Sequence, residues 1–578
     1  MAHPAYCLVF LLTVLAISLA RRAFSSSKPK NLPPSPTGLP IIGHMHLIGS
    51  SPHRALYALA KRYGDILSLR FGSLPYVVVS SPAAAREFLR THELAFASRP
   101  QGAMAAQYLG YGGHGFAFSP YGPYWKFMRK LCMSELLSGR SLANFLPIKR
   151  HEIRRFLSLL SDAAVDGREM NVGEEMKLLV GNVLSRMSMS RECSSSEKEA
   201  AEIRQLVDQV SELLMEFYVG DYISLLRHVD LQGMGKRLKS THSRFDEIME
   251  EIMRDHETKK QKKEEERRSG GGEVKDLMDM LLEISEDDSA DMKLTRNQIK
   301  AFIRTPRGHV HAFGLPNIMK ATFLDEVKTD GNVATGNFYV SYSYPSDMIG
   351  PFIYRAVFPS YRLLVLDVFV AGVATTALGM EWALAELVNN PRVLQKAREE
   401  IESVVGKHRL VEESDIPNLP YVQAVIKETL RLHPTDPIIM RESIQDCNVG
   451  GYHIPSKTGV FINVWAVGRD PSYWDKPLEF LPERFIDEKG RSQIDLRGQH
   501  YHFLPFGSGR RGCPGTTLAL QMIETTIAGI VQCFDMKVNG NGGKVDLSEK
   551  PGMTLYLAQP LCCVPVARLH PLPPLPEL

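Results

Sequence analysis

The chain of 578 residues predicts a mainly helical fold with a minor β component. Beyond residue 81, most segments carry apolar residues at three- and four-residue spacing, which is typical of amphipathic helices. The stretch 66–81, ILSLRFGSLPYVVVSS, instead alternates and is rich in β-branched residues, which predicts strands. The length is sufficient for one large catalytic core with a deeply buried site.

Charge and cysteine content exclude several other classes of protein. The formal net charge is +3, and the basic residues form no stripe with interleaved aromatics, so nucleic acid is not an expected partner. The eight cysteines are scattered and include no C-x-x-C pair, which excludes a zinc ribbon and a small disulfide scaffold. We therefore expect the chain to reside in a reducing compartment.

The N-terminal segment predicts a membrane anchor over residues 1–22. Residues 4–20 are uncharged and mostly apolar, and Arg21 and Arg22 follow directly. A cleavable secretory signal is the alternative, because the sequence SLA at 18–20 resembles a small-residue cleavage site. No Lys or Arg precedes the apolar run, and this charge asymmetry favours an uncleaved anchor with the catalytic bulk in the cytosol.

Composition divides the rest of the chain. Residues 23–44 form a polar linker and a Pro-rich hinge, because the prolines of NLPPSPTGLPIIGH forbid helix. Residues 45–566 form the catalytic domain, and residues 567–578 form a Pro-rich tail.

One region, residues 304–365, does not fit a helical domain. The amphipathic run LTRNQIKAFI ends at Ile303, and a long apolar helix is predicted over residues 366–390; joined directly, the two would share one apolar face. The residues between them hold five prolines and a tyrosine cluster, which no continuous helix accommodates. We interpret residues 304–365 as an atypical insertion, either genuine protein or a retained intron, because long structureless connections are rare inside compact domains.

The stretch FLPFGSGRRGCPG, which ends at Gly515, admits two interpretations. Gly507, Gly509 and Gly512 spell G-x-G-x-x-G, the phosphate-binding turn of dinucleotide-binding folds, and Asp535 follows the next helix as a ribose-binding acid would. That turn requires a surrounding succession of parallel strands and helices, which the sequence does not show. The first interpretation is therefore disfavoured.

In the second interpretation the glycines wrap the backbone around Cys513. Amide N–H groups would then lie near its sulfur, and the predicted helix 516–534, opened by Pro514, would direct its positive end toward a thiolate. A thiolate held in this way is a metal ligand, whereas an isolated cysteine in a tight turn is by default a structural residue.

The motif PFGSGRRGCPG resembles the cysteine loop of the cytochromes P450. The family pattern falls on Phe506, Gly509, Arg511, Cys513 and Gly515. The resemblance implies the cytochrome P450 fold and a haem b cofactor bound through these residues. Cys513 would be the axial thiolate ligand of the iron, an arrangement that favours O–O cleavage.

Two further motifs resemble the Glu-Arg-Arg network of that family. KETLRLHP supplies Glu428 and Arg431, and LPERF supplies Arg484. The resemblance implies that the three residues brace the core beneath the cysteine loop. Spacing alone places Glu428 and Arg431 on one helical face and favours a surface ion pair.

The residues that the resemblance assigns to the haem propionates come from three segments. WKFMR places Trp125 and Arg129 four residues apart on one helical face. Both would donate hydrogen bonds to a propionate, and Arg511 and Arg441, the latter from PIIMRES, would join them.

The oxygen-activating helix of the family reads Ala/Gly-Gly-x-acid-Thr, and AGVATT is its counterpart here. Gly372 and Thr375 match the pattern, and the resemblance makes Thr375 the hydroxyl that hydrogen-bonds dioxygen. Ala374 stands where the family has an acid that helps to relay protons. Two hypotheses follow: water replaces the acid, or the coupling of electrons to product is poor.

The segments FAFSPYGPYWKFMRKLCMSELLSGRSL and FVAGVATTALGMEWALAELVNNP resemble plant microsomal P450s of the flavonoid branch, the group of flavone synthase II, flavanone 2-hydroxylase and isoflavone synthase. The resemblance implies an NADPH- and O₂-dependent monooxygenase of the endoplasmic reticulum membrane that hydroxylates a flavanone-type substrate at C2 or desaturates it to a flavone. NADPH and flavins would act only through a partner, NADPH–cytochrome P450 reductase. The segments expected to line a pocket for this flat aromatic substrate are 98–118, 371–376, 434–440 and 555–558.

Two alternatives remain open. Ala374 and the insertion at 304–365 favour a non-catalytic or impaired haem-binding protein of the same fold. A P450 that acts on another plant phenolic fits the motifs equally.

Overall fold

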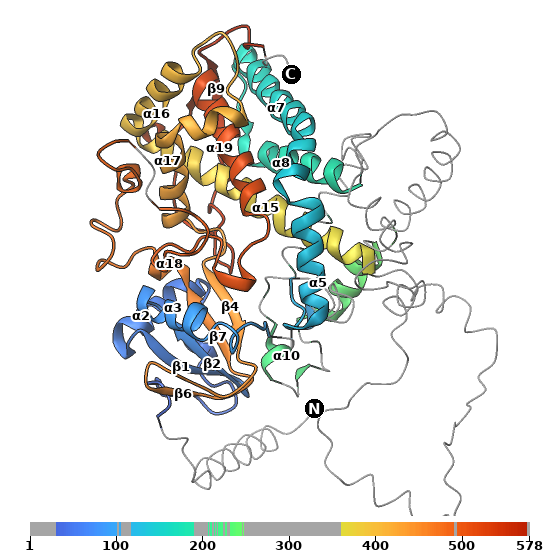
Figure 1. The fold of residues 1–578 in the computed structure, drawn as a ribbon, viewed down its shortest axis with the longest axis vertical. Coiled ribbons are helices and arrows are strands. Elements are labelled where there is room, and N and C mark those ends of the chain that lie inside the picture. Colours follow the sequence, from blue (N-terminus) through green and yellow to red (C-terminus); the bar gives the residue numbers. More distant parts are fainter. Residues whose placement is uncertain are drawn as a thin grey trace, which may run out of the picture. The chain divides into compact units, whose positions relative to one another are not determined.

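The computed structural model describes residues 31–100, 103–105, 117–189, 360–490 and 494–574, with scattered positions between residues 206 and 247. The elements named below lie in one compact unit, Met1–Met280 with Leu363–Leu578, apart from the first three residues of one helix. The predicted mainly helical fold with a minor β component is confirmed (Figure 1).

A four-stranded sheet in the order β1-β2-β7-β4 forms the β-rich part of this unit. Its strands are β1 (Ile66–Phe71), β2 (Leu74–Val79), β7 (Gly459–Asn463) and β4 (Ile438–Glu442). Strands β2 and β7 pair in parallel, and the other two pairs are antiparallel. Every residue of β7 is buried, as expected of a central strand. The strands predicted within 66–81 are therefore confirmed as the hairpin β1–β2.

Short helices cover this sheet. Helix α2 (Pro52–Tyr63) places Leu56 in one apolar cluster with Leu67 of β1 and Val78 of β2. Helix α3 (Pro82–Arg86) continues into the turn η2 (Glu87–Thr91), whose Phe88 lies in a second buried cluster with Ile462 of β7. The alternation of the strands thus buries apolar residues on both faces of the sheet.

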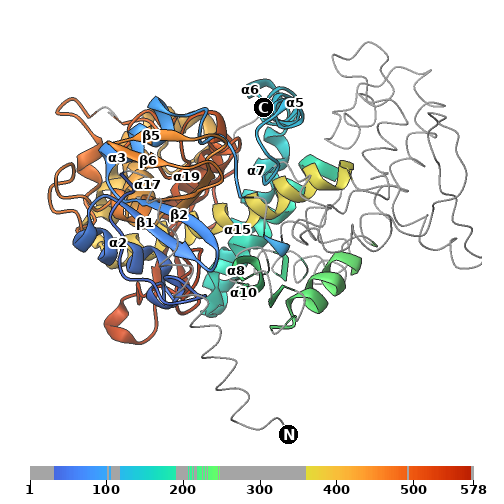
Figure 2. The same cartoon turned by 90° about the horizontal axis from the view of Figure 1, so that it is seen from below.

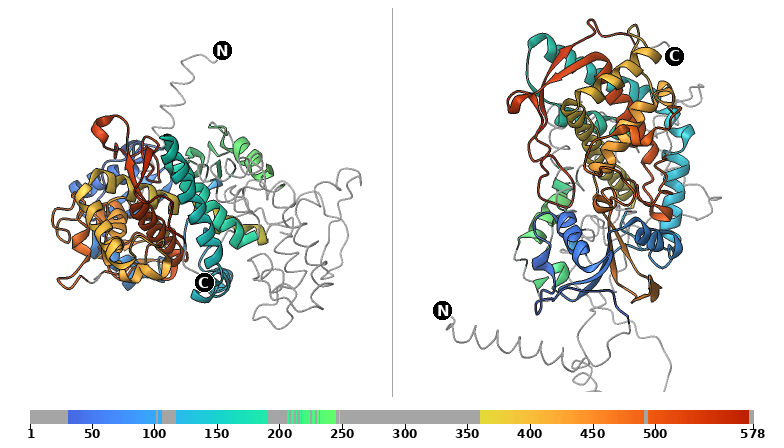
Figure 3. Two further views of the ribbon diagram at one scale, coloured as in Figure 1. Left: turned by 90° about the horizontal axis from the view of Figure 1, so that it is seen from above. Right: turned by 90° about the vertical axis from the view of Figure 1, so that its left-hand side faces the viewer.

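The larger part of the unit is helical and lies beside the sheet in Figures 1 and 3. Its elements are α5 (Pro123–Leu131), α6 (Gly139–Asn144), α7 (Leu146–Asp166), α8 (Val172–Met189), α10 (Val219–Tyr222), α15 (Ser360–Asn389), α16 (Pro391–Val404), α17 (Pro420–Leu432), α18 (Val464–Val467) and α19 (Thr516–Cys533). Helices α16, α17 and α19 pack against one another, and α7 packs against α8 and α19. Helix α19 is buried at every position from Met522 to Cys533, which explains why apolar residues are frequent on all sides of it.

Helix α15 runs between α8 on one side and α17 and α19 on the other (Figure 2). A Cβ at Gly372 would lie 2.7 Å from Cδ1 of Leu184 in α8, and one at Gly379 would lie 2.8 Å from Cδ1 of Ile523 in α19. Glycine at these two positions therefore allows the helices to approach closely. The helix begins at Ser360 rather than at the predicted Leu366, so it takes in the last six residues of the predicted insertion 304–365.

The remaining elements are short. The three-stranded sheet β3-β9-β8 contacts helix α7 through its strand β9. Figure 3 shows this sheet beside α7. The bounds of the small elements are β3 (Met170–Asn171), β8 (Phe534–Lys537), β9 (Cys562–Ala567), β5 (Cys447–Val449), β6 (Tyr452–Ile454), η1 (Met45–Leu47), η3 (Cys132–Leu136), η7 (Glu413–Asn418), η8 (Pro482–Phe485), η9 (Gly509–Arg511) and η10 (Asn541–Gly543).

Two sequence predictions fall outside the described residues: the anchor at residues 1–22 and the insertion from residue 304 to residue 359. Within the described part of the chain, no helix is long and apolar enough to cross a bilayer. The described part of the hinge, residues 31–44, contains no helix, as its prolines predict, and Gly43 bridges to Phe71 at the edge of the sheet.

Candidate functional site

The cysteine loop, residues 503–515, closes on itself just before α19. The backbone N–H of Cys513 donates to the Phe506 carbonyl at 2.9 Å. Gly507 and Gly509 adopt φ angles of +71° and +66°, a region that glycine enters without strain, so the loop requires glycine at both positions. Arg511 lies in the turn η9, and Cys513 follows two residues later.

This geometry contradicts the dinucleotide-binding interpretation of the glycines. The nearest described strand before the loop is β7, which ends at Asn463, so the turn does not join a parallel strand to α19. Asp535, the expected ribose-binding acid, lies in β8 and pairs with Arg398 at 2.7 Å. Gly515 is the N-cap of α19, so Pro514 precedes the helix rather than opening it.

Cys513 lies in the loop immediately before α19, and its side chain has solvent-accessible surface. Surrounding protein groups nevertheless desolvate the thiol, and this burial raises its pKa. The Gly515 N–H, the Thr516 hydroxyl and the Arg129 guanidinium act in the opposite direction and lower the pKa. The sulfur is thus prepared for a cationic partner such as a metal ion, which would complete its deprotonation.

Three arginines from distant segments contact the backbone of this region. Arg129 on α5 donates from Nη1 to the Gly512 carbonyl at 2.8 Å. Arg511 donates from Nε to the Ala97 carbonyl at 2.7 Å and from Nη2 to the Ser119 carbonyl at 2.6 Å. Arg441 at the end of β4 donates from Nη2 to the Arg511 carbonyl at 3.4 Å. Residues 129, 441 and 511, predicted as one site, therefore do lie together.

Trp125 orders two of these arginines. Its ring is buried, and the guanidinium carbons of Arg511 and Arg129 lie 4.3 Å and 5.5 Å from the ring centroid. Cation–π contacts of this kind hold guanidinium groups in place without neutralising them. The motif WKFMR thus contributes both a charge and the aromatic surface that positions it.

Burial and mutual repulsion lower the pKa values of the arginine side chains. The pKa of Arg441 falls well below its ordinary value because of burial and the charges of Arg99 and Arg511. The pKa of Arg511 is lowered to about 9 by burial, Arg99 and Arg129. Among the described residues, Arg129, Arg441 and Arg511 donate to backbone carbonyls and form no ion pair. An anionic ligand would relieve the repulsion, and the two carboxylates of a haem have that chemistry.

Arg99 is the member of this arginine cluster that the sequence analysis missed. Its charge acts on Cys513, Arg441 and Arg511 alike. In the sequence it lies within 98–118, a segment predicted only as pocket lining. A basic residue at the edge of an apolar segment is a weak signal, and nothing local connects it with a loop some four hundred residues later.

The Glu-Arg-Arg network is buried, which corrects the surface ion pair that spacing alone favours. Both carboxylate oxygens of Glu428 accept from Arg431 at 2.7 Å, and Oε1 also accepts from Nε of Arg484 at 3.0 Å. The Glu428 and Arg431 side chains are completely buried. Arg431 further donates to the carbonyls of Gly468 and Pro477. The network therefore joins α17 to the segment before η8, where every charge has a partner.

The oxygen-activating sequence lies on α15 with its hydroxyl accessible. Thr375 is half-buried and donates from Oγ1 to the Ala371 carbonyl at 2.6 Å, while Ala374 is buried. Because the hydroxyl proton is engaged within the helix, the oxygen remains available to accept a hydrogen bond. Gly372 contacts Leu184, which gives that glycine a packing role in addition to the predicted one.

The segments predicted to line a substrate pocket meet in part. The backbone N–H of Leu555 donates to the Thr435 carbonyl at 3.3 Å, and Nε1 of Trp382 on α15 donates to the Leu555 carbonyl at 2.8 Å. Segments 434–440 and 555–558 are therefore neighbours and both adjoin the helix that carries Thr375. Of segment 98–118, residues 101–102 and 106–116 lie outside the described residues.

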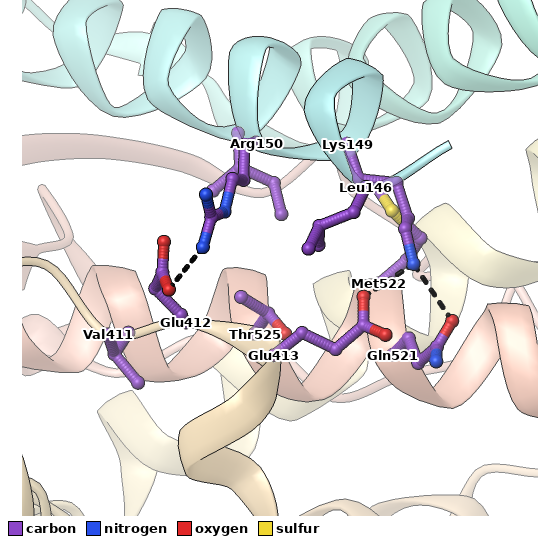
Figure 4. Close-up of a pocket in the computed structure, with 10 residues that line it drawn as sticks. Leu146, Lys149, Arg150, Val411, Glu412, Glu413, Gln521, Met522 and Thr525 are labelled. Carbon is purple, nitrogen blue, oxygen red and sulfur yellow. Dashed lines mark hydrogen bonds and ion pairs between the residues drawn. The ribbon is translucent and has the colours of Figure 1, made fainter. Parts of the chain in front are cut away.

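A small cavity between α7, α19 and η7 differs from the arginine cluster, because positive and negative side chains are paired in its lining (Figure 4). Lys149 on α7 reaches the Glu413 carboxylate and, at 3.0 Å, the side-chain oxygen of Gln521, while Arg150 pairs with Glu412. Each charged side chain that lines this cavity has a partner of opposite sign. We interpret it as a clamp on α19, the helix that follows Cys513, and not as a ligand site.

Comparison with known proteins identifies the family. The sequence model of the family described as "Cytochrome P450" matches residues 33–305 and 360–562. The chain is 44% identical over 571 residues to 3,9-dihydroxypterocarpan 6A-monooxygenase of Glycine max, which covers 98% of this chain and 99% of the relative. It is 42% identical over 571 residues to Beta-amyrin 24-hydroxylase of Glycine max, with 98% of each chain covered. It is 37% identical over 591 residues to 2-hydroxyisoflavanone synthase of Glycyrrhiza uralensis, with 98% of this chain and 99% of the relative covered.

A solved structure agrees with this assignment at the level of the fold. A zebra fish cytochrome P450 with progesterone matches with a TM-score of 0.66 at 24% identity, covering 89% of this chain and 99% of that chain. The chain therefore belongs to the cytochrome P450 family and is a P450 monooxygenase. The predicted resemblance to plant P450s of the flavonoid branch is confirmed. The family uses a haem with a cysteine thiolate ligand, electrons from NADPH delivered through a reductase, O₂ and a small-molecule substrate.

Proposed function

We propose that Cys513 ligates the haem iron and that Arg129, Arg441 and Arg511, with Arg99, hold the haem propionates. The support is the combination of a thiol that surrounding protein desolvates and a cluster of guanidinium groups, of which Arg129, Arg441 and Arg511 form no ion pair with a described carboxylate. When bound, the haem supplies the activation of O₂, and the thiolate favours O–O cleavage. Glu428, Arg431 and Arg484 brace the core beneath it.

The chain's own residues manage protons around that chemistry. Hydroxylation converts R–H, O₂, NADPH and H⁺ into R–OH, H₂O and NADP⁺, and desaturation removes two hydrogens and forms two waters, so both reactions consume protons. Thr375 offers a hydroxyl oxygen on the accessible side of α15, and Ala374 offers no carboxyl group. Water ordered by Thr375 therefore carries the protons, at a cost in coupling relative to a fixed acid.

The proposed substrate is a flavonoid, and the proposed reaction is C2 hydroxylation or desaturation of a flavanone. The observation that carries the flavonoid class is the 44% identity to a pterocarpan 6A-monooxygenase, together with the match to 2-hydroxyisoflavanone synthase over nearly the full chain. Both names describe hydroxylated ring systems of the flavonoid type. The apolar segments around Leu555 and Thr435 suit such a substrate.

A second candidate is hydroxylation of a triterpene. The chain is 42% identical to Beta-amyrin 24-hydroxylase, which is a higher identity than that to 2-hydroxyisoflavanone synthase. An impaired haem-binding protein is the third candidate, because Ala374 replaces an acid and residues 306–359 fall outside the family match.

We further propose that residues 1–22 anchor the chain in the endoplasmic reticulum membrane and that NADPH–cytochrome P450 reductase is its electron donor. The support is the apolar run before Arg21 and Arg22. Residues 304–359 are proposed to be an insertion, because the family match resumes at residue 360, where α15 begins.

The test uses microsomes that contain the full chain and reductase. We expect a thiolate-type Soret band in the reduced, carbon-monoxide-treated sample and NADPH-dependent addition of oxygen to, or loss of two hydrogens from, a flavanone. Pterocarpan and β-amyrin are supplied in parallel. Turnover of β-amyrin alone supports the second candidate, and a normal band without any turnover supports the third. A band that appears only after deletion of residues 304–359 means that the insertion blocks the enzyme.

A further inference from the structure

The segment Glu93–Arg99 forms hydrogen bonds with the cysteine loop on the side that faces the sheet. Its Ala97 carbonyl accepts from Nε of Arg511 at 2.7 Å. At its start, Oε1 of Glu93 accepts from the backbone N–H of Arg510 at 2.6 Å, and its Oε2 lies 3.3 Å from Nε of the same arginine. The backbone N–H of Arg510, its side chain and the side chain of Arg511 therefore all contact this one short segment.

This segment is itself held firmly. Phe96 is buried and its ring lies 4.7 Å, centroid to centroid, from that of Phe88 in the apolar cluster of the sheet. The Ala95 carbonyl accepts from the Ile444 N–H at 2.8 Å, and the Ser98 carbonyl accepts from the Glu442 N–H at 2.9 Å. A carboxylate that projects from such a support has little freedom to follow a moving loop.

The contact at Gly509 shows how closely Glu93 approaches the loop. A Cβ at Gly509 would meet the Glu93 Oε1 atom, and Gly509 has a φ of +66°. Glycine at this position thus has two roles: it adopts the left-handed backbone conformation, and it leaves space for the Glu93 carboxylate. The backbone of η9 is defined on one side by its own glycine and on the other by Glu93.

We propose that Glu93 is a positioning residue that holds the turn η9 and thereby sets the place of the Cys513 sulfur relative to the haem. Its carboxylate accepts a charge-assisted hydrogen bond from the backbone N–H of Arg510, three residues before Cys513. Hydrogen bonds to a charged group are shorter and stronger than neutral ones. The proposal concerns the cofactor of the family and is independent of the identity of the substrate.

Two roles for Glu93 must be separated, because the residue also pairs with the exposed Arg510 side chain. If Glu93 acts through the loop backbone, residue 93 needs a side-chain oxygen that lies within hydrogen-bond distance of the Arg510 N–H. If it acts only as a surface ion pair, it needs the Arg510 guanidinium, and exposed pairs contribute little. Four substitutions distinguish these roles: Glu93→Ala, Glu93→Gln, Glu93→Asp and Arg510→Ala.

The readout is the share of thiolate-type Soret band in the reduced, carbon-monoxide-treated full chain, together with the rate of haem loss to a haem-accepting protein. In Glu93→Ala we expect haem loss to be roughly tenfold faster, since a hydrogen bond to a charged group is removed, and a large share of the band to shift to the inactive, non-thiolate form. In Glu93→Gln the amide oxygen keeps the reach, so most of the native band is retained. In Arg510→Ala the backbone N–H remains, so the spectrum is native.

Glu93→Asp decides the matter even where Glu93→Ala fails to fold. Aspartate keeps the negative charge, but its side chain is too short to meet the Arg510 N–H. If Glu93 acts through the loop backbone, the thiolate band is therefore weaker in Glu93→Asp than in Glu93→Gln. If Glu93 acts only as an ion pair, the band is stronger in Glu93→Asp. Glu87→Ala is the matched control, because Glu87 is a half-exposed carboxylate in the neighbouring η2 whose polar partners among the described residues are His92 and Thr91. The proposal is overturned if Glu93→Asp exceeds Glu93→Gln, if Arg510→Ala is as damaging as Glu93→Ala, or if Glu93→Ala behaves like Glu87→Ala.

Discussion

The Glu-Arg-Arg network and the arginine cluster both bury guanidinium groups, but they balance them differently. In the network, one carboxylate, Glu428, accepts from both Arg431 and Arg484, and backbone carbonyls take the remaining donors. In the cluster, the hydrogen bonds of Arg441 and Arg511 to described groups all go to backbone carbonyls, and neighbouring arginines lower their pKa values, an effect that Asp436 and Glu93 oppose only in part for Arg441. The first arrangement is complete within the described residues, whereas we propose that an anionic ligand completes the second.

Buried charge thus distinguishes structural sites from ligand sites in this molecule. A charge with an internal partner of opposite sign stabilises the fold in every state of the protein. A set of like charges without such a partner destabilises the protein until the ligand arrives. Substitutions in the two regions are therefore expected to have effects of opposite sign on the protein without haem.

The largest effect is expected from Glu428→Ala, which removes the only carboxylate of the network. The buried Arg431 and the partly buried Arg484 then lose their counter-charge, and the free energy of unfolding falls by about 3–5 kcal/mol. Denaturant unfolding of the haem-free protein measures this loss. Glu479→Ala is the control, because its side chain is more than half exposed and its ion pair among the described residues is with Lys476. Equal stability of the two variants would contradict the comparison.

An intermediate case is Glu524 on α19, a buried carboxylate on which the charge of Lys427 acts. Burial raises the pKa of Glu524 to about 7, and Lys427 only partly opposes that shift. The folded protein therefore binds more protons than the unfolded one between pH 4.5 and 7, so the contribution to stability is full below pH 4.5 and is lost as the pH rises through 7. The total loss is about 3 kcal/mol.

Glu524→Gln removes this dependence on pH. Unfolding curves of the native chain and the variant at pH values of about 5 and about 8 are compared, and the variant should gain about 3 kcal/mol relative to the native chain at the higher pH. Glu399→Gln, an exposed position on α16, is the control and should show no such gain. A constant difference between native chain and Glu524→Gln would show that Glu524 titrates normally.

The contrast is sharpest in Arg441→Leu. Removal of one repelled guanidinium should leave the haem-free protein as stable as before or more stable, because similar-sized apolar residues commonly replace buried charges without loss. Haem should dissociate about tenfold faster, since one charge-assisted hydrogen bond to a propionate is missing. Haem transfer and haem-free unfolding measure the two quantities.

Arg431→Leu is the matched control for Arg441→Leu, because both replace a fully buried arginine. The network variant should lose stability both with and without haem. If Arg441→Leu destabilises the haem-free protein as strongly as Arg431→Leu does, the arginine cluster is structural and not a ligand site.

The smallest effect is expected from Ala374→Asp, which supplies the missing carboxyl group beside Thr375. The share of NADPH that yields product rather than peroxide should rise, by less than the roughly hundredfold that a well-placed general acid contributes. Because Ala374 is buried, stability should fall by about 1–3 kcal/mol. Ala374→Asn has the same size but no proton to give, so an equal improvement in both variants would exclude proton delivery as the cause.

Local motifs account for the parts of the site that could be predicted. The cysteine loop is contiguous in the chain, and its glycines determine the backbone that surrounds Cys513. The hairpin within 66–81 follows from alternation, and Thr375 follows from the resemblance of AGVATT to the family's motif on a long apolar helix. The dinucleotide interpretation fails because G-x-G-x-x-G describes three glycines and not the elements on either side of them.

Other features depend on contacts that no local pattern encodes. Glu428 and Arg431 look like a surface pair at a spacing of three residues, and only the packing of α17 against the segment before η8 buries them. Arg99 and Glu93 carry no motif, yet both lie against the cysteine loop. The start of α15 at Ser360 differs from the expected Leu366 because short-range periodicity is weak in an apolar helix.

The sequence by itself therefore determined the class of chemistry: a thiolate candidate in a glycine-bounded loop, a hydroxyl on a long apolar helix and the absence of an acid at residue 374. These are properties of neighbouring residues, whose backbone conformation is set locally. The tertiary structure alone decided which buried charges meet a carboxylate and which lie close to charges of the same sign. Burial and electrostatic interaction depend on distance in space, and the fold brings Arg99, Arg129, Arg441 and Arg511 together from four separate parts of the chain.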